Sequence, residues 1–156
     1  MRSVAPFEFG LVVADIDALL PFYVDVLGLA LLSDIVVPAA TSRATGLAPE
    51  GYRVVRLQTN RGDRLKLARA DGLLDDPGIA AYPMQRRGNA YLTLIVADVQ
   101  STFDALRRAG ASVRSEGIVT LRPGVRLVLA TDPEGNWLEF LQYDDLASYR
   151  PASLQS

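Results

Sequence analysis

The chemistry open to this chain is limited by two residue types that it lacks, because none of its 156 residues is a histidine or a cysteine. Imidazole is the most frequent transition-metal ligand and the usual proton carrier near neutral pH, while thiolates are the other soft ligands and strong nucleophiles. A serine triad is excluded because no histidine can act as its base, and neither a G-x-G-x-x-G after a strand nor a phosphate loop is present. Any activity must therefore use carboxylates, amines, guanidinium groups or hydroxyls.

The composition is that of a folded protein of one domain or of two small modules that share a core. Hydrophobic residues make up 49% and charged residues 22% of the sequence. The formal charge is −2, and the basic residues are dispersed, which argues against a nucleic-acid partner. No secretory signal and no run of about eighteen apolar residues is present, so we expect a cytoplasmic protein without a membrane partner.

One pattern occurs twice. Residues 11–17 read L-V-V-A-D-I-D and residues 94–100 read L-I-V-A-D-V-Q. Each run is rich in β-branched residues, which favours a strand, and contains an aspartate that can cap a helix. Apolar residues at helical spacing follow each run up to Gly28 or Gly110, where a left-handed terminal residue is expected. Pro21 should delay or bend the first helix.

The second half of each copy predicts a strand, a tight turn and a strand, and Gly62 and Gly135 occupy turn positions that favour positive φ. The R-G-D sequence at 61–63 is interpreted as an ordinary turn. We therefore predict an α+β fold of two βαβββ modules. Module one covers about 6–70, a linker 71–88, module two 89–145 and a tail 146–156, with an inserted loop within 38–51. Chance similarity between the copies is improbable, because the strand, cap, helix, glycine and hairpin occur in the same order in both. A ferredoxin-like domain would also use βα units but does not need the second hairpin.

The chain resembles the vicinal oxygen chelate superfamily, also called the glyoxalase, bleomycin-resistance and extradiol-dioxygenase superfamily. The likeness rests on F-E-F-G-L-V-V-A-D-I-D-A-L-L-P-F-Y-V-D-V-L-G-L in the first copy, and on A-Y-L-T-L-I-V-A-D-V-Q and D-P-E-G-N-W-L-E-F in the second. It spans residues 7–143. The resemblance implies that the modules form a curved mixed sheet around a cavity with the helices outside, and that the protein is a homodimer.

In metal-dependent members, a histidine opens each module and a glutamate or another ligand lies on each module's last strand. By this resemblance the opening positions are Glu8 and Tyr91, and the last-strand positions are Lys66 and Glu139. Only Glu139 keeps the expected residue, and the Lys66 ammonium has no lone pair for a metal. We therefore expect neither a metal nor another cofactor.

Two interpretations of these positions stay open. In one, Glu8, Lys66 and Glu139 form a satisfied structural cluster in which the lysine takes the neutralising place of a divalent ion. In the other, the cluster faces a ligand, and Tyr91 donates a hydrogen bond while Lys66 or a protonated glutamate holds a carbonyl or phenol oxygen.

Strand alternation extends the candidate wall. Gly10 and Val12 share the side of Glu8, and Arg64 and Ala68 share the side of Lys66. Trp137, the only tryptophan, either stacks on a flat aromatic guest or serves core or dimer packing. The candidate ligand-binding residues are Glu8, Arg56, Gln58, Lys66, Tyr91, Thr93, Trp137 and Glu139.

The resemblance and these residues favour a metal-independent protein that sequesters an aromatic metabolite or antibiotic. The alternative is a metal-free lyase, isomerase or cyclase whose catalytic residues are Glu139, Glu8, Tyr91 and Lys66. A metal-dependent dioxygenase or glyoxalase is the least favoured reading.

Overall fold

The computed structural model describes residues 6–72, 74–75 and 78–149, and the chain divides into two compact units at Gly78 and Ile79. This division falls inside the predicted linker, 71–88. Positions 73 and 76–77 of that linker and 150–156 of the predicted tail lie outside the described residues. Among the described residues, no helix is long and apolar enough to cross a membrane.

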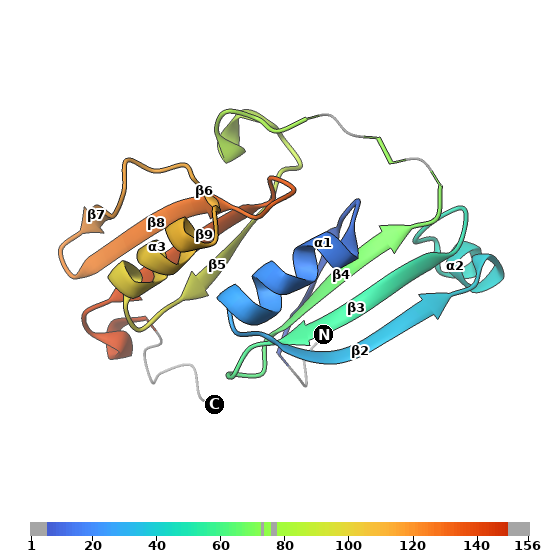
Figure 1. Ribbon diagram of the computed structural model, residues 1–156, viewed down its shortest axis with the longest axis horizontal. Helices are drawn as coiled ribbons and strands as arrows, with labels where there is room; N and C mark the ends of the chain where they lie inside the picture. Colours follow the sequence, from blue (N-terminus) through green and yellow to red (C-terminus); the bar gives the residue numbers. More distant parts are fainter. Residues whose placement is uncertain (1–5, 73, 76–77, 150–156) are drawn as a thin grey trace. The chain divides into compact units, whose positions relative to one another are not determined.

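The N-terminal unit is a four-stranded mixed sheet with helix α1 on one face (Figure 1). The strand order is β1-β4-β3-β2, with β1 parallel to β4 and the other neighbours antiparallel. Its elements are β1 (Glu8–Val12), α1 (Ile16–Pro21), the π-helical turn η1 (Phe22–Val26), β2 (Ala30–Val37), α2 (Ala39–Thr45), β3 (Tyr52–Gln58) and β4 (Arg64–Ala70).

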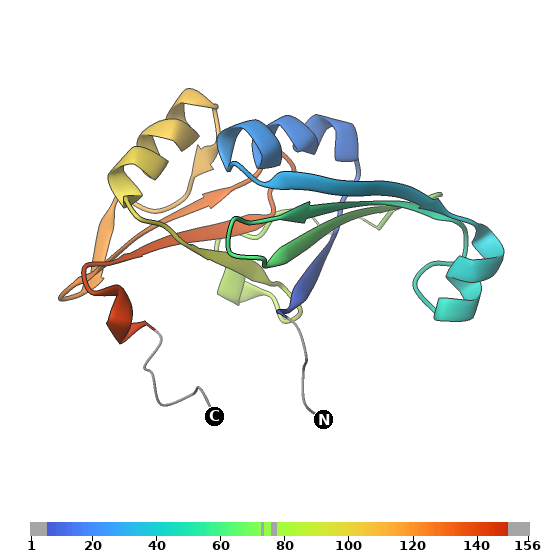
Figure 2. The ribbon, with the colours of Figure 1, turned by 90° about the horizontal axis from the view of Figure 1, so that it is seen from below.

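The C-terminal unit repeats this plan with the order β5-β9-β8-β6, and β7 also pairs with β8. Helix α3 lies on one face of the sheet (Figure 2). Its elements are η2 (Pro83–Gln85), β5 (Tyr91–Ile95), α3 (Val99–Arg108), β6 (Ser112–Val113), β7 (Val119–Arg122), β8 (Val125–Thr131), β9 (Trp137–Tyr143) and η3 (Leu146–Ser148). The predicted α+β class is confirmed, as is the duplicated module.

The second module differs from the prediction in one strand, which is split into β6 and β7. Between them, the Ser115 hydroxyl accepts a hydrogen bond from the Leu129 amide at 3.1 Å and donates to the Gly117 carbonyl at 2.7 Å. The side chain thus replaces backbone ladder bonds, which is a known tendency of serine.

The predicted helix ends are confirmed. Asp15 accepts from the Ala18 amide at 3.1 Å, and Asp98 accepts from the amides of Gln100 and Ser101. Gly28 and Gly110 follow with φ of 73° and 71°, in the left-handed region where glycine carries no penalty.

Pro21 changes the geometry of the first helix as expected. Regular α-helix stops at Pro21, and the next turn widens so that the Leu27 amide bonds to the Phe22 carbonyl, five residues back. Proline cannot donate to the preceding turn, and π-helical turns are one response to such a local defect.

The predicted loop at 38–51 is wrong in part, because α2 occupies residues 39–45. The buried Ser42 hydroxyl donates to the Ala48 carbonyl at 2.9 Å, and Gly46 ends the helix with φ of 73°. Since a helix of this length is marginal by itself, these contacts explain why the segment is ordered.

Both cores lie between one helix and one face of its sheet. In the N-terminal unit, Val55, Leu57, Leu65 and Leu67 alternate toward α1 and are almost completely buried. In the C-terminal unit, Val128, Leu138 and Phe140 are equally buried with Val99 and Leu106 of α3.

Arg53 ties the first helix to the sheet. Its guanidinium lies 2.9 Å from Asp17 of α1 and 2.8 Å from Asp34 of β2. The Arg53 hydrogen bond holds the pKa of Asp34 below its usual value of 3.8. This triad links α1 to β3 and β2 through partly exposed side chains.

The hairpin at 132–136 generates a stability prediction. Asp132 is 2% exposed and accepts hydrogen bonds from the amides of Glu134 and Asn136 and from the Asn136 side chain. We expect Asp132→Ala to lower the free energy of unfolding by about 2 kcal/mol, because the substitution leaves these donors unsatisfied. Urea unfolding measures the change.

The matched control is Asp63→Ala in the first hairpin, where the exposed carboxylate accepts one long bond, 3.4 Å from Thr59 Oγ1. Equal losses for the two variants would contradict a special role for the Asp132 network.

Candidate functional site

The face of the N-terminal sheet opposite α1 carries most of its charged side chains, and we call it the polar face. We call a row of directly paired residues across the strands a rung. Cross-strand pairing places Glu8, Arg64 and Gln58 on one rung. The next rung on the same side carries Gly10, Lys66, Arg56 and Ser33. Directly paired residues point to the same side of a sheet, so all seven belong to the polar face.

Glu8 is held between two cations. Arg64 Nη1 donates to Glu8 Oε1 at 3.0 Å, and Lys66 Nζ lies 3.5 Å from Glu8 Oε2. Arg64 also donates from Nε to Gln58 Oε1 at 2.9 Å. The predicted contact between Glu8 and Lys66 is therefore present, but the stronger partner of Glu8 is Arg64.

These contacts set the ionisation of Glu8. The hydrogen bond from Arg64 holds the pKa of Glu8 below its usual 4.5, and the positive charge of Lys66 acts in the same direction against the opposing effect of desolvation. Glu8 is thus a carboxylate at neutral pH.

Arg56 differs from its two basic neighbours. Within the described part of the chain, no hydrogen bond or ion pair engages its side chain, although it lies opposite Lys66 on the same rung. Lys66 is the only lysine of the chain. The two rungs therefore carry three cations and a single carboxylate.

The two ends of the rung that carries Lys66 and Arg56 are the small residues Gly10 and Ser33. A Cβ at Gly10 has no atom within 4 Å, so the space over this residue is open. At the other end, the Ser33 hydroxyl is buried without a hydrogen-bond partner among the described residues.

The remaining predicted residues lie on the C-terminal sheet, on the face opposite α3. Tyr91 pairs with Trp137 and Thr93 pairs with Glu139. Thr93 Oγ1 donates to Glu139 Oε2 at 2.7 Å, while the Tyr91 side chain is 43% exposed. Glu139 therefore has a hydroxyl partner in its own unit.

Trp137 has a packing role that the sequence left open. The residue is only 6% exposed, and the Arg114 guanidinium lies 5.2 Å from its ring centroid. Arg114 also donates to the Ala81 carbonyl at 3.4 Å. One ring face is thus covered, and stacking of a ligand on Trp137 stays a prediction.

The structure groups the eight predicted residues into two sets. Glu8, Arg56, Gln58 and Lys66 share two rungs of one sheet. Tyr91, Thr93, Trp137 and Glu139 share two rungs of the other. The convergence of both sets on one cavity stays a prediction.

The sequence placed Arg64 on the candidate wall but not among the candidate ligand-binding residues, and it did not single out Arg114. Arg64 had a usable signal, since it lies two positions before Lys66 on one strand and so shares its face. Arg114 had none, because it follows β6 where the strand breaks.

The residues at the four family positions do not fit a divalent metal. The Glu8 oxygens face Arg64 and Lys66, and the Lys66 ammonium cannot donate a lone pair. In the described ranges, no group of three or more acidic, histidine or cysteine residues could hold an ion.

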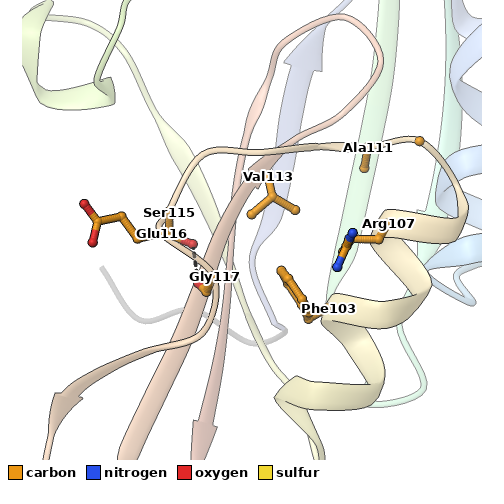
Figure 3. Close-up of a pocket in the computed structure, with 8 residues that line it drawn as sticks. Phe103, Arg107, Ala111, Val113, Ser115, Glu116 and Gly117 are labelled. Carbon is orange, nitrogen blue, oxygen red and sulfur yellow. Dashed lines mark hydrogen bonds between the residues drawn. The ribbon is translucent and has the colours of Figure 1, made fainter.

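An open pocket lies elsewhere, between α3 and residues 110–117 of the C-terminal unit (Figure 3). Phe103, Arg107 and Val113 surround it, and the Glu116 side chain points away. It contains none of the predicted site residues.

Comparison with known proteins identifies the family. The model of the Glyoxalase/Bleomycin resistance protein/Dioxygenase superfamily matches residues 5–140. The chain therefore belongs to this superfamily, and the resemblance inferred from its motifs is confirmed. No curated protein matches the chain.

Solved structures share the fold at low sequence identity. A glyoxalase family protein from Bacillus cereus is 23% identical with a TM-score of 0.74, over 92% of this chain and 96% of that one. The trypanothione-dependent glyoxalase I of Leishmania major is 18% identical with a TM-score of 0.65, over 90% and 87% of the two chains. A virulence protein of Salmonella typhimurium is 20% identical with a TM-score of 0.58, over 92% and 99%.

The ion pairs of Glu8 generate a pH prediction. Arg64→Gln should raise the Glu8 pKa toward 4.5, and Lys66→Met should raise it less, because the Arg64 bond is the larger cause of the shift. A folded-state pKa below the unfolded one stabilises the protein above about pH 4.5, and this stabilisation is lost as the pH falls through the folded-state value.

Carboxyl ¹³C NMR titration of Glu8 measures the shifts in all three proteins. A Glu8 pKa that is the same in the wild type and in Arg64→Gln would show that the pair does not form in solution.

Proposed function

We propose that this chain is a metal-independent binding protein of the superfamily that sequesters a small aromatic metabolite or antibiotic. The observation that carries the proposal is the 3.5 Å contact of the Lys66 ammonium with Glu8, at positions where metal-dependent members carry ligands by the resemblance. A lysine there supplies the positive charge of an ion without its coordination chemistry.

The polar face has the properties of a binding wall. It combines charged groups of both signs, the amide of Gln58 and open space over Gly10. Specific sites commonly combine a few placed polar groups with room for a ligand. We propose further that Tyr91, Thr93, Trp137 and Glu139 contribute to the same site, and that the protein is a cytoplasmic homodimer.

Ligand titration tests the binding proposal. We expect members of a panel of aromatic natural products to change the Trp137 fluorescence saturably and to be recovered unchanged. Gly10→Leu should weaken this binding at least about tenfold, because the new side chain fills the open space over the polar face.

Gly10→Ala is the graded control, since its methyl group meets no atom within 4 Å and leaves most of the space. Recovery of an altered product at catalytic turnover would remove the pure-binding claim, and equal affinity in the wild type and Gly10→Leu would move the site away from the polar face.

A metal-free lyase, isomerase or cyclase is the second candidate. The 2.7 Å bond from Thr93 to Glu139, one rung from Tyr91, favours it because it orients a carboxylate beside a phenol. If the protein turns over a ligand, Glu139→Gln should lower kcat at least about 100-fold with affinity retained, as expected for loss of a proton-transfer group. Unchanged product formation would exclude Glu139 as the base.

Metal dependence, the least favoured reading, has its own measurement. Elemental analysis of protein prepared without chelator should show no stoichiometric metal after dialysis. A retained equivalent would restore the dioxygenase or glyoxalase reading.

A further inference from the structure

We infer that the ligand of the polar face is an anion, with a carboxylate or a similar planar pair of oxygens held by Arg56 together with Lys66. The inference rests on the proposed binding function and names the class of ligand. A site that merely accepts an aromatic ring does not require this charge.

The charge balance of the two rungs is the first argument. Arg56, Arg64 and Lys66 face the single carboxylate of Glu8, which leaves an excess of two positive charges. The Arg64 guanidinium is engaged by Glu8 and Gln58, and Lys66 makes only a 3.5 Å contact with the second Glu8 oxygen. The excess charge is therefore concentrated on Lys66 and Arg56.

Their pairing is the second argument. Arg56 and Lys66 are direct cross-strand partners, and like charges at such positions destabilise a sheet. The rest of their rung is Gly10 and Ser33, so no carboxylate on it offsets the repulsion. Side chains paired in this way start about 5 Å apart at Cβ, within reach of one shared carboxylate.

The surroundings of the pair are the third argument. The open space over Gly10 adjoins Lys66, and the buried Ser33 hydroxyl without a partner lies beside Arg56. Arginine presents a planar fork of donors that matches a carboxylate, and lysine adds a point charge. The arrangement suits an aromatic acid better than a neutral ring.

A matched pair of probes tests the inference, namely 2-naphthoate and 2-naphthamide, which share one ring system and differ in charge. We expect the wild type to bind naphthoate at least about tenfold more tightly, with an advantage that falls as salt rises. Backbone ¹⁵N NMR should place the shifts in β1, β3 and β4. Because Lys66 is the only lysine, ¹³C reductive methylation provides one lysine signal on this rung.

Substitutions separate the role of Arg56 from the charge of the whole protein. Arg56→Gln should abolish the preference for naphthoate, and Arg56→Lys should keep part of it. The control is Arg69→Gln, which removes the same charge from the opposite face of β4, where Arg69 donates to the Ala14 carbonyl. This control should keep the full preference, and NMR dispersion verifies the fold of every variant.

Each outcome is decisive. Equal affinity for the two probes at the polar face would overturn the anion inference and leave the binding function standing, as would naphthoate binding that shifts only other elements. A full preference in Arg56→Gln would remove Arg56 from the site. Absence of any shift with both probes up to about 10 mM would overturn the inference and count against the proposed function as well.

Discussion

The two-residue period of β4 fixes both the core and the chemistry of the N-terminal unit. Leu65 and Leu67 lie under α1, and the intervening Arg64 and Lys66 consequently point to the other side. A slip of one residue would bury two cations and expose two leucines, so the register is strongly specified. Strand β9 repeats the constraint, because burial of Leu138 and Phe140 directs Trp137 and Glu139 to the opposite face. The positions of the polar groups are therefore a consequence of core packing.

The three cations of the polar face differ in how many contacts restrain their side chains. Arg64 is fixed by two acceptors, Lys66 by one longer contact, and Arg56 by none in the described part of the chain. Removing Glu8 would leave three like charges on adjacent rungs, which is unfavourable at these separations. The carboxylate is thus best understood as the group that allows the cations to share one face. The net positive charge that remains on the polar face after this pairing attracts negatively charged groups.

The sequence predicted features that depend on local patterns. The helix caps at Asp15 and Asp98, the left-handed glycines and the split of each module into a helix and a sheet follow from nearby residues. One contact that it did not predict depends on a distant partner. The Arg64 bond to Glu8 joins residues 56 positions apart, so it follows from the parallel register of β1 and β4 and not from any motif. The helix at 39–45 and the break after β6 depend instead on particular side-chain bonds, of Ser42 to the Ala48 carbonyl and of Ser115 to the Gly117 carbonyl and the Leu129 amide, and no sequence motif marks these bonds.

Glu8 and Glu139 differ in their electrostatic surroundings, and this difference bears on the catalytic interpretation. A carboxylate whose pKa is lowered by two cations is a weaker proton acceptor, and the same cations oppose its protonation, so Glu8 suits neither acid nor base catalysis. Glu139 contacts the neutral hydroxyl of Thr93 and lies one rung from the phenol of Tyr91, which leaves it the better candidate for proton transfer. Of the two glutamates, Glu139 therefore suits the proposed catalytic alternative better, while the charges around Glu8 suit the proposed binding function. Arg56 and Lys66 present the same positive charge on the polar face under either proposal.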